Sequence, residues 1–318
     1  MGSRRTISPM KASGERVALA SFVIGSLIAG GNSVGVRFSN RELAPLWGAG
    51  FRFSLAAALL LAVMAALKLA FPRGRALTGA LVFGVFNFAA PFALAYYGLV
   101  RVHAGLGQTL LALVPLLTLL LAVAHRQERF RLPALLGTLL ALIGIALISR
   151  APLRESVPLL SMLALVGGAL CFAEAAVLVR WFPPVHPVTM NAVGMTTGAI
   201  LLVAGSLVAG DPHVLPERAA TWVALAYLVV SSGLIFVLYI VVLQRWPASR
   251  AAYVFVLSPV VTVLLSAWLD DEPIGAGLVL GGLLVLVGVY VGALRSAAPP
   301  PAPAEAEIVA RGHEDAES

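Results

Sequence analysis

Residues 113–121 read LVPLLTLLL and residues 257–265 read LSPVVTVLL, so one apolar segment with a proline and a threonine occurs twice, 144 positions apart. Without a gap, Glu128 then aligns with Glu272. Further upstream, residues 25–37 match residues 168–180 at an offset of 143. A repeat of this length is half a protein rather than a solenoid unit. Duplicated halves in a hydrophobic chain are typical of membrane transporters.

The composition indicates that the solvent of this chain is a lipid bilayer. Of its 318 residues, 60% are hydrophobic and 12% are charged, whereas about 25% of the residues in a soluble domain are charged. The mean hydropathy is +0.95. The single cysteine, Cys171, allows no intramolecular disulfide and no cysteine-based metal site. The net charge of +7 comes from basic residues at the ends of apolar segments, which is typical of topology signals and not of nucleic-acid binding.

The apolar segments predict an all-α integral membrane protein with ten transmembrane helices. A spanning helix needs about 20 mainly apolar residues, and the segments lack the alternation of a barrel strand. The predicted spans are 17–39, 46–67, 77–99, 105–124, 132–149, 157–179, 188–209, 221–243, 251–269 and 274–294.

The repeat divides these spans into two halves of five helices. The predicted order is an N-terminal segment (1–16), a first repeat (17–149), a linker (150–156), a second repeat (157–295) and a disordered tail (296–318). With both termini in the cytoplasm, the inner segments hold 15 Lys and Arg residues and the outer segments hold 6, as the positive-inside rule requires. Five spans per half make the second repeat inverted relative to the first, which places a substrate site near the midplane.

The paired motifs resemble the EamA-like branch of the drug/metabolite transporter superfamily. The resemblance covers about residues 17–295 and rests on Pro115-x-x-Thr118 with Glu128, on Pro259-x-x-Thr262 with Glu272, and on Arg52-Phe53. It implies ten helices in two inverted halves, and the overall character is most similar to bacterial amino-acid exporters, including the YddG type. Gly30-Gly31-Asn32 departs from the family's usual Trp-Gly-Ser/Ala-x-Phe pattern, which leaves the substrate open.

Uncharged polar residues inside the spans are the candidates for substrate binding. The resemblance implies that the first, third, fourth, eighth and ninth spans line the cavity, and a few polar groups in an apolar pocket give orientation. The alternative is hydrogen bonding between helices, worth about 0.6 kcal/mol each. The set is Asn32, Asn87, Tyr96, Tyr97, Gln108, Tyr239, Tyr253 and Ser258.

Two charged residues lie inside predicted spans. Glu174 is the only acidic residue well within a span, where an ionised carboxylate costs at least about 2.5 kcal/mol. It therefore either handles protons or substrate, or has a structural partner in a water-filled vestibule. Arg52 lies at a different depth, so we expect it to bind carbonyl groups or the outer rim and not to pair with Glu174.

Prolines and glycines mark places where the spans bend or approach one another. Pro115 and Pro259 occupy equivalent positions, and each removes one helical hydrogen bond. They are either hinges that gate a cavity or static kinks. The glycine pairs Gly194/Gly198 and Gly288/Gly292 allow close helix packing, within a monomer or at a dimer seam.

No catalytic, metal-binding or nucleotide-binding motif occurs, and the histidines lie at span ends, in loops or in the tail. We therefore predict a non-enzymatic secondary transporter of the bacterial inner membrane, without cofactor or metal. The predicted partners are the lipid bilayer and a small substrate, with amino acids first, and no nucleic acid. The predicted state is a monomer, with a dimer left open. A multidrug or lipophilic-cation exporter is the alternative, and a non-transporting receptor or scaffold is a further one.

Overall fold

A computed structural model describes residues 9–99, 110–149, 158–258, 260–261 and 276–294, and every regular element among them is helical. The elements are α1 (Pro9–Ser39), α2 (Pro45–Ala66), α3 (Arg75–Gly84), a π-helical turn (Val85–Ala89), α4 (Ala90–Leu99), α6 (Val114–Ala124), α7 (Leu132–Ser149), α8 (Leu159–Leu178), a 3₁₀ turn (Val179–Trp181), α9 (Pro187–Ala209), α10 (Ala219–Leu243), α11 (Ala248–Ala251), α13 (Ala276–Val289) and a second π-helical turn (Tyr290–Leu294).

Six of the predicted spans are confirmed as apolar helices long enough to cross a bilayer: those in α1, α2, α3–α4, α8, α9 and α10. The fifth and tenth spans are shorter apolar helices, and the fourth and ninth extend into residues outside the described ranges. Leucine, isoleucine and valine side chains remain exposed along α1, α7, α9 and α10, as lipid-facing surfaces require. The described part of the chain is therefore an all-helical, multi-pass membrane protein.

Helix α1 starts eight residues before the predicted span. Its 31 residues correspond to about 46 Å at 1.5 Å per residue, which exceeds the roughly 30 Å hydrocarbon thickness. The hydropathy pattern marks only the stretch in lipid, whereas the helix continues beyond it. The beginning of α1 therefore extends past the membrane-spanning window, which starts at Gly14.

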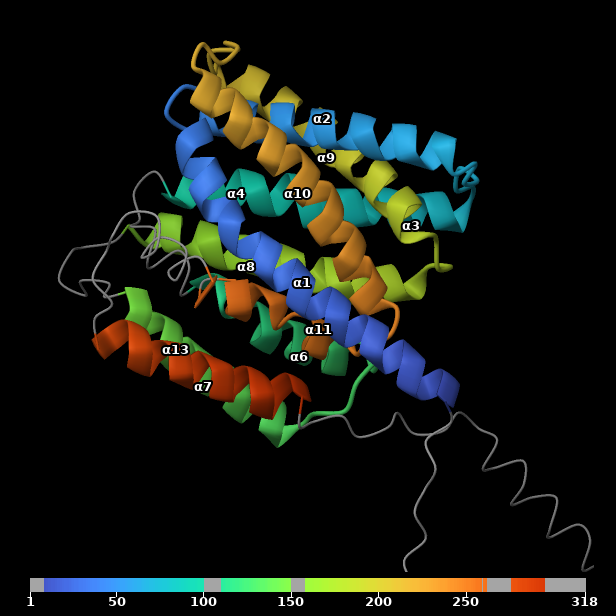
Figure 1. Ribbon diagram of the computed structural model, residues 1–318, viewed down its shortest axis with the longest axis vertical. Coiled ribbons are helices and arrows are strands. Elements are labelled where there is room, and N and C mark those ends of the chain that lie inside the picture. Colours follow the sequence, from blue (N-terminus) through green and yellow to red (C-terminus); the bar gives the residue numbers. More distant parts are fainter. Residues whose placement is uncertain (1–8, 100–109, 150–157, 259, 262–275, 295–318) are drawn as a thin grey trace, which may run out of the picture.

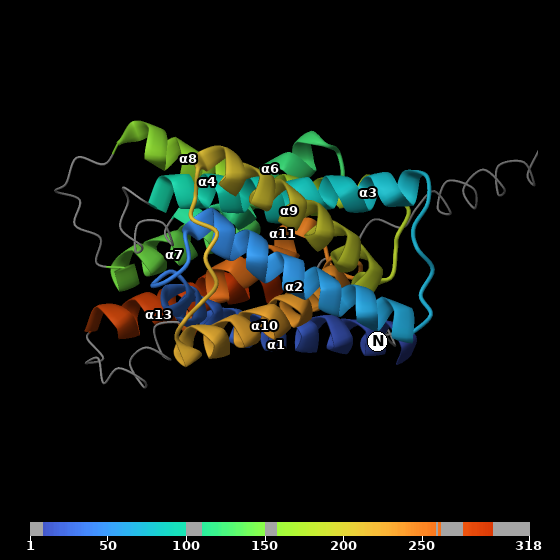
Figure 2. The ribbon, with the colours of Figure 1, turned by 90° about the horizontal axis from the view of Figure 1, so that it is seen from above.

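The two halves pack on each other helix by helix (Figures 1 and 2). The most extensive pairs are α1 with α10, α4 with α8, α2 with α9, and α7 with α13. Under the sequence repeat, α1 corresponds to α8 and α10 to α3–α4, so the first two pairs are equivalent. The other two pairs each join a helix to its own counterpart. In Figure 1, α2 and α9 lie at the top of the molecule, and α7 and α13 lie at the bottom.

Glycines set the distance between α7 and α13. A Cβ at Gly137 would lie 2.6 Å from the Gly288 carbonyl oxygen, and one at Gly144 would lie 2.5 Å from that of Gly281. Gly194 and Gly198 pack in the same way against Phe83 and Phe88. A Cβ at Gly292 would meet the Tyr253 hydroxyl, so the predicted pairs Gly194/Gly198 and Gly288/Gly292 both pack against helices of the same monomer.

The helices end in two groups of connections, one of which we call the Glu42 end. There, Glu42 of the α1–α2 connection binds the α9–α10 connection. Its carboxylate accepts the backbone N–H groups of Glu217 (2.8 Å) and Arg218 (3.2 Å) and lies 3.2 Å from the Arg218 guanidinium. Nearby, Trp47 Nε1–H donates to the Val214 carbonyl at 2.7 Å. Although burial acts to raise the pKa of Glu42, the hydrogen bonds from Arg218 and Glu217 hold it below its ordinary value.

The opposite end, called here the Glu15 end, contains the start of α1. There, Glu15 contacts Trp246 and Arg250, which follow α10. Arg180, which follows α8, donates to the Leu243 and Trp246 carbonyls. Arg75 at the start of α3 donates to the Trp181 carbonyl at 3.3 Å. Contacts between the halves thus exist at both ends of the bundle.

The α7–α13 packing generates a stability prediction. Gly137→Ala removes room that the Gly288 backbone occupies, and we expect a loss of about 1–3 kcal/mol, as for overpacked cores. Gly205→Ala in α9 is the matched control, because nothing lies within 4 Å of its Cβ position. That change should instead stabilise the helix by about 0.5–1 kcal/mol. Thermal unfolding in detergent measures both, and equal shifts would contradict the packing argument.

The lowered pKa of Glu42 generates a pH prediction. A carboxylate with a depressed pKa adds stability above its unfolded pKa and loses it as the pH falls through the folded value. We therefore expect Glu42→Gln to lower the unfolding temperature at pH 7. The difference in unfolding temperature between the variant and the wild type should disappear as the pH falls below 4.5, the ordinary pKa of a glutamate. The exposed neighbour Glu217→Gln serves as control, and a gap that is independent of pH would refute the interpretation.

Candidate functional site

Seven aromatic side chains form a continuous series of ring contacts through both halves of the bundle. Measured between ring centroids, Phe53 of α2 lies 5.3 Å from Phe88 and 4.8 Å from Phe92. Phe88 continues to Phe236 of α10 at 4.7 Å, and Phe92 continues to Phe172 of α8 at 6.0 Å. Phe255 extends the series, because it lies 4.9 Å from Phe172 and 5.9 Å from Tyr239, which is the last member. We call Phe53, Phe88, Phe92, Phe172, Phe236, Tyr239 and Phe255 the aromatic cluster.

Asn87 is placed beside this cluster by a π-helical turn. Pro91 has no N–H for the Asn87 carbonyl four residues earlier, and the Ala90 N–H reaches back to the Val85 carbonyl. The extra residue of such a turn is frequently found at functional sites. The Asn87 side chain is completely buried, and neither its amide nitrogen nor its oxygen has a hydrogen-bond partner in the described structure. Each such orphaned group costs about 1–3 kcal/mol.

Tyr239 is the second buried side chain, after Asn87, of which no polar atom has a hydrogen-bond partner in the described structure. Its side chain is 4% exposed, and its hydroxyl has no hydrogen-bond partner among the described residues. Tyr239 helps to line a cavity of about 10 Å³ together with Ser21, Phe22, Gly25, Ile235, Val242, Ala251 and Val254. This volume suits about one water molecule. Both residues are thus tied to the aromatic cluster, since Asn87 directly precedes Phe88 in the chain and Tyr239 lies 5.9 Å from Phe255.

Asn32 and Tyr253 instead have partners within the protein. The Asn32 side chain accepts the Ser231 hydroxyl at 2.6 Å, which joins α1 to α10. The Tyr253 hydroxyl donates to the Ala134 carbonyl at 2.8 Å and lies 3.0 Å from the Thr138 hydroxyl. These contacts favour the interpretation of both residues as interhelical ties.

The other members of the polar set are placed less fully. Ser258 is half-buried in the helical residues 254–258 and has a partner. Tyr97 is exposed on α4. Tyr96 is in α4, but its side chain lies outside the described part, as do the whole of Gln108 and Pro259.

The structure gives Glu174 a partner that the sequence did not suggest. Glu174 of α8 lies close to His125, the residue that follows α6. The distance between Glu174 Oε1 and His125 Nε2 is 3.5 Å, and both side chains are about one-fifth exposed. The His125 ring lies 4.8 Å from the Trp181 ring. This contact favours the structural-partner alternative for Glu174. No spacing along the chain could have revealed it, because it depends on the docking of α6 against α8.

Arg52 is buried and donates from Nε to the Ser232 hydroxyl at 2.8 Å. Its guanidinium also lies 5.1 Å from the Phe53 ring centroid, on the edge of the aromatic cluster. It thus binds a side-chain hydroxyl of α10, and the expected binding of carbonyl groups or the outer rim stays a prediction. Glu174 and Arg52 have separate partners, as their different depths predicted.

The fourth span is interrupted where a kink was expected. A turn at Ala112–Leu113 precedes α6, and Pro115 is at its second position. The Leu113 N–H donates to the Leu110 carbonyl at 3.1 Å, three residues earlier. In the described part of the second half, a turn at Ala252–Tyr253 interrupts the helix, and Pro259 itself lies outside the described residues. Both halves therefore contain a broken helix, but the two breaks are not at equivalent positions.

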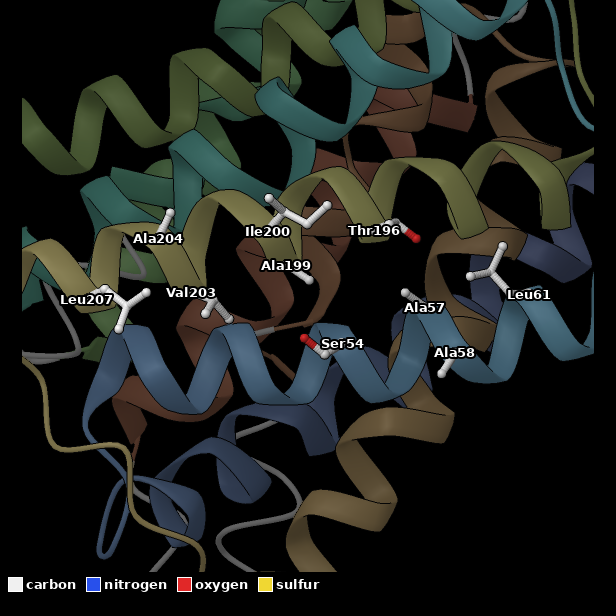
Figure 3. Close-up of a pocket in the computed structure, with 10 residues that line it drawn as sticks. All are labelled: Ser54, Ala57, Ala58, Leu61, Thr196, Ala199, Ile200, Val203, Ala204 and Leu207. Atoms are coloured by element: carbon white, nitrogen blue, oxygen red, sulfur yellow. The ribbon is translucent and has the colours of Figure 1, made fainter.

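A groove of about 480 Å³ runs between α2 and α9 (Figure 3). Its residues are Ser54, Ala57, Ala58, Leu61, Thr196, Ala199, Ile200, Val203, Ala204 and Leu207. The Ser54 and Thr196 hydroxyls donate to the Gly50 and Ala192 carbonyls of their own helices. The groove thus presents apolar side chains and engaged hydroxyls, several of them on the lipid-facing surface. The aromatic cluster with Asn87 and Tyr239 is the stronger candidate for a substrate site.

Comparison with known families decides the class of the protein. The profile of the EamA-like transporter family matches the chain twice, at residues 16–150 and 159–293. The chain belongs to the EamA-like transporter family. This membership confirms the resemblance inferred from the paired proline and glutamate motifs. The two matches fall on the two halves that the repeat defines.

Relatives of this EamA-like transporter include proteins of several bacteria, two of which are named as a transporter or an exporter. It is 28% identical to the uncharacterized transporter YyaM of Bacillus subtilis, over 77% of this chain and 83% of that protein. Protein PagO of Salmonella typhimurium is 26% identical over 85% and 90% of the two chains. A probable terminal-alkyne amino-acid exporter of Streptantibioticus cattleyicolor is 28% identical over 69% and 74%.

A crystal structure with a TM-score of 0.76 and 18% identity covers 88% of this EamA-like transporter and 99% of its own chain. At this identity the likeness establishes a shared fold.

The unpartnered amide generates a paired prediction about stability. Asn87→Leu removes two polar atoms that have no hydrogen-bond partner, so the unfolding temperature should stay the same or rise. Asn191→Leu is the matched control, because its amide donates to the Pro187 and Phe236 carbonyls at 2.9 and 3.0 Å. That change should cost about 1–3 kcal/mol, because two buried carbonyls lose a donor. A larger loss at Asn87 than at Asn191 would show that Asn87 has a structural partner.

Proposed function

We propose that this protein is a secondary carrier that exports amino acids or related small metabolites by alternating access, without chemical conversion of the solute. The observation that carries the proposal is the buried Asn87 amide without a hydrogen-bond partner, beside the aromatic cluster. An amide offers two donors and one acceptor, which suits both the carboxylate and the ammonium group of a zwitterion. A bound solute would supply the hydrogen-bond partners that Asn87 lacks among the described residues.

The directions of the helices support an inverted repeat of two five-helix halves. Helix α1 begins at the Glu15 end, where Glu15 binds Trp246. Its counterpart α8 finishes at that same end, where Arg180 binds the Trp246 carbonyl. Counterparts that run in opposite directions are the hallmark of inverted-topology transporters. Such carriers expose a shared site to one side of the membrane at a time.

The distribution of Lys and Arg supports a cytoplasmic location for both termini and for the Glu15 end. We accordingly place the carrier in the bacterial inner membrane as a monomer, with a dimer left to experiment. Reporter fusions after Arg75, Arg131 and in the tail should then read inside, and one after Asp211 should read outside. A periplasmic signal from the tail would refute this topology.

Charge favours a zwitterion over a phosphorylated solute. Phosphate recognition calls for Arg or Lys groups that are free to point at the ligand. The buried arginines among the described residues, Arg52 and Arg250, already engage Ser232 and Glu15. One relative is named a probable amino-acid exporter, which agrees with this preference.

A lipophilic cation is the second candidate substrate, because the aromatic cluster favours it. Aromatic faces attract cations by about 0.5–2 kcal/mol each, most strongly when water is excluded. The cluster offers seven rings within the bundle. A cation would need few hydrogen bonds, so its transport should depend on the rings and not on the Asn87 amide.

Transport by the purified protein in proteoliposomes tests these proposals. The panel contains neutral amino acids, organic cations, a sugar phosphate and a nucleotide, with and without a pH gradient. We expect several neutral amino acids to be carried and to compete with one another. Saturable exchange of the sugar phosphate without amino-acid flux would overturn the proposal.

The same assay tests the role of Asn87. Loss of one hydrogen-bonded contact to a charged group costs about 1.5–3 kcal/mol, so Asn87→Leu should raise the apparent KM for amino acids at least about tenfold. Asn191→Leu, corrected for the amount of folded protein, should keep the wild-type KM. Cation transport with an unchanged KM in Asn87→Leu would favour the second candidate.

A further inference from the structure

The segment between α10 and α11 is held by the start of α1. Glu15 Oε1 lies 2.7 Å from Arg250 Nη2, and Glu15 Oε2 accepts the Trp246 indole N–H at 3.0 Å. The Arg250 guanidinium lies over the Trp246 ring, 3.6 Å from its centroid. Glu15 belongs to the first half of the chain, and Trp246 and Arg250 belong to the second. We call these three residues the Glu15 clasp.

The same segment is held from its other side by the α6–α7 connection. Glu128 accepts the Ser249 backbone N–H at 3.1 Å and also the Ser249 hydroxyl. Arg131 donates to the Ser249 hydroxyl oxygen at 3.0 Å and lies 3.5 Å from Glu128. Residues 246–250 are therefore bound to the first half at two separate points. The Glu15 end can separate only if these contacts break.

Burial makes Arg250 dependent on the clasp. The Arg250 side chain is 7% exposed, whereas that of Glu15 is 50% exposed. Arg250 Nε has no hydrogen-bond partner within the described structure. The compensation of its charge thus comes from Glu15 and the Trp246 ring. Removing one partner of a buried ion pair is strongly destabilising, because the other charge stays uncompensated.

The residues at the positions equivalent to the clasp in the other repeat cannot form the same contacts. At the repeat offsets, Glu15 corresponds to Pro158 and Trp246 to Val102. Ser249 corresponds to Gly105 and Arg250 to Leu106, although Glu128 has its counterpart in Glu272. None of the four replacing side chains can donate or accept a hydrogen bond. An inverted repeat interchanges its two ends, so a state closed at the Glu42 end would lack these side-chain contacts.

We propose that the Glu15 clasp is a gate latch, which holds the protein closed at the Glu15 end and makes this closed form the resting state. The latch is a conformational device that can be measured without a substrate. Combined with the proposed export, it implies that a cytoplasmic solute can load only after the clasp has opened. The latch then controls the first step of each transport cycle.

The accessibility of a cysteine behind the clasp tests the latch. Ser21 lies on α1, is 7% exposed and lines the small cavity next to Ala251. Ser21→Cys in a Cys171→Ser background provides a single thiol behind the closed gate. A charged maleimide should label it only when the Glu15 end opens. In this parent protein without solute, labelling should be at least about tenfold slower than after denaturation, and equally rapid labelling would overturn the resting-state assignment.

The variants compare two nearby arginines. Arg250→Gln and Glu15→Gln should each raise the labelling rate about tenfold or more, within the usual range of coupling between conformations. Arg245→Gln is the control, because Arg245 is exposed and donates to the Val241 carbonyl of its own helix. The doubly changed protein Glu15→Arg with Arg250→Glu should return towards slow labelling. Unchanged labelling in Glu15→Gln, or equal acceleration in Arg245→Gln, would overturn the latch.

Folding is checked separately by size-exclusion chromatography and thermal unfolding. If Arg250→Gln does not fold, Glu15→Gln and Ser249→Ala decide the question, because Glu15 is half exposed and Ser249→Ala removes a single hydroxyl. Both must accelerate labelling for the latch to stand. Since no solute is present, failure of transport in proteoliposomes with an intact labelling response would reject the proposed function and leave the latch in place.

Discussion

The requirement that governs this structure is that every backbone polar group in lipid must find its partner inside the protein. Helices meet it, and several hydroxyls add to it by donating to the carbonyl four residues earlier, as Ser26 does to Phe22 and Thr118 to Val114. The π-helical turn before Pro91 and the break before Pro115 are local departures from this regularity. In lipid, irregular backbone of this kind is tolerated where protein or a water-filled cavity surrounds it. The departures therefore draw attention to the interior of the bundle.

Most polar side chains inside the bundle are engaged in joining helices, and this gives meaning to the exceptions. Asn32, Arg52, Tyr253 and Asn191 each bind a group on another helix. Asn87, which directly precedes Phe88, and Tyr239, which contacts Phe255, have no such partner among the described residues, although both are buried. Gln127 and Asn191 each leave one amide oxygen without a partner but donate from the nitrogen, whereas both polar atoms of Asn87 lack a partner, which carries a cost. We attribute the presence of this amide to the proposed function, in which it binds the solute.

The sequence predicted what depends on local pattern and failed where side chains meet across helices. The repeat, the helical class and six long spans followed from hydropathy and spacing, and the family followed from the paired motifs. The partnership of Glu174 with His125 and the contact of Glu15 with Arg250 join residues 49 and 235 positions apart. Glu15 in particular read as part of a polar segment before the first span, because hydropathy cannot show that α1 extends beyond the membrane. The break near Pro115 was anticipated in place, but the break at Ala252–Tyr253 has no proline beside it.

The asymmetry of the two repeats is as informative as their likeness. Two identical halves would make the states open to either side equal in energy, and such a carrier would have no preferred resting form. Here the glutamate after the proline motif is kept in both repeats, whereas Trp246, Ser249 and Arg250 have apolar or glycine counterparts. Because every 1.4 kcal/mol changes a conformational equilibrium about tenfold, the proposed latch, in which Glu15 compensates the buried Arg250, needs only a small energy to shift the preference. In the alternating-access mechanism proposed here, the duplicated architecture supplies two states, and a few substitutions without a counterpart in the other repeat determine which state the carrier occupies at rest.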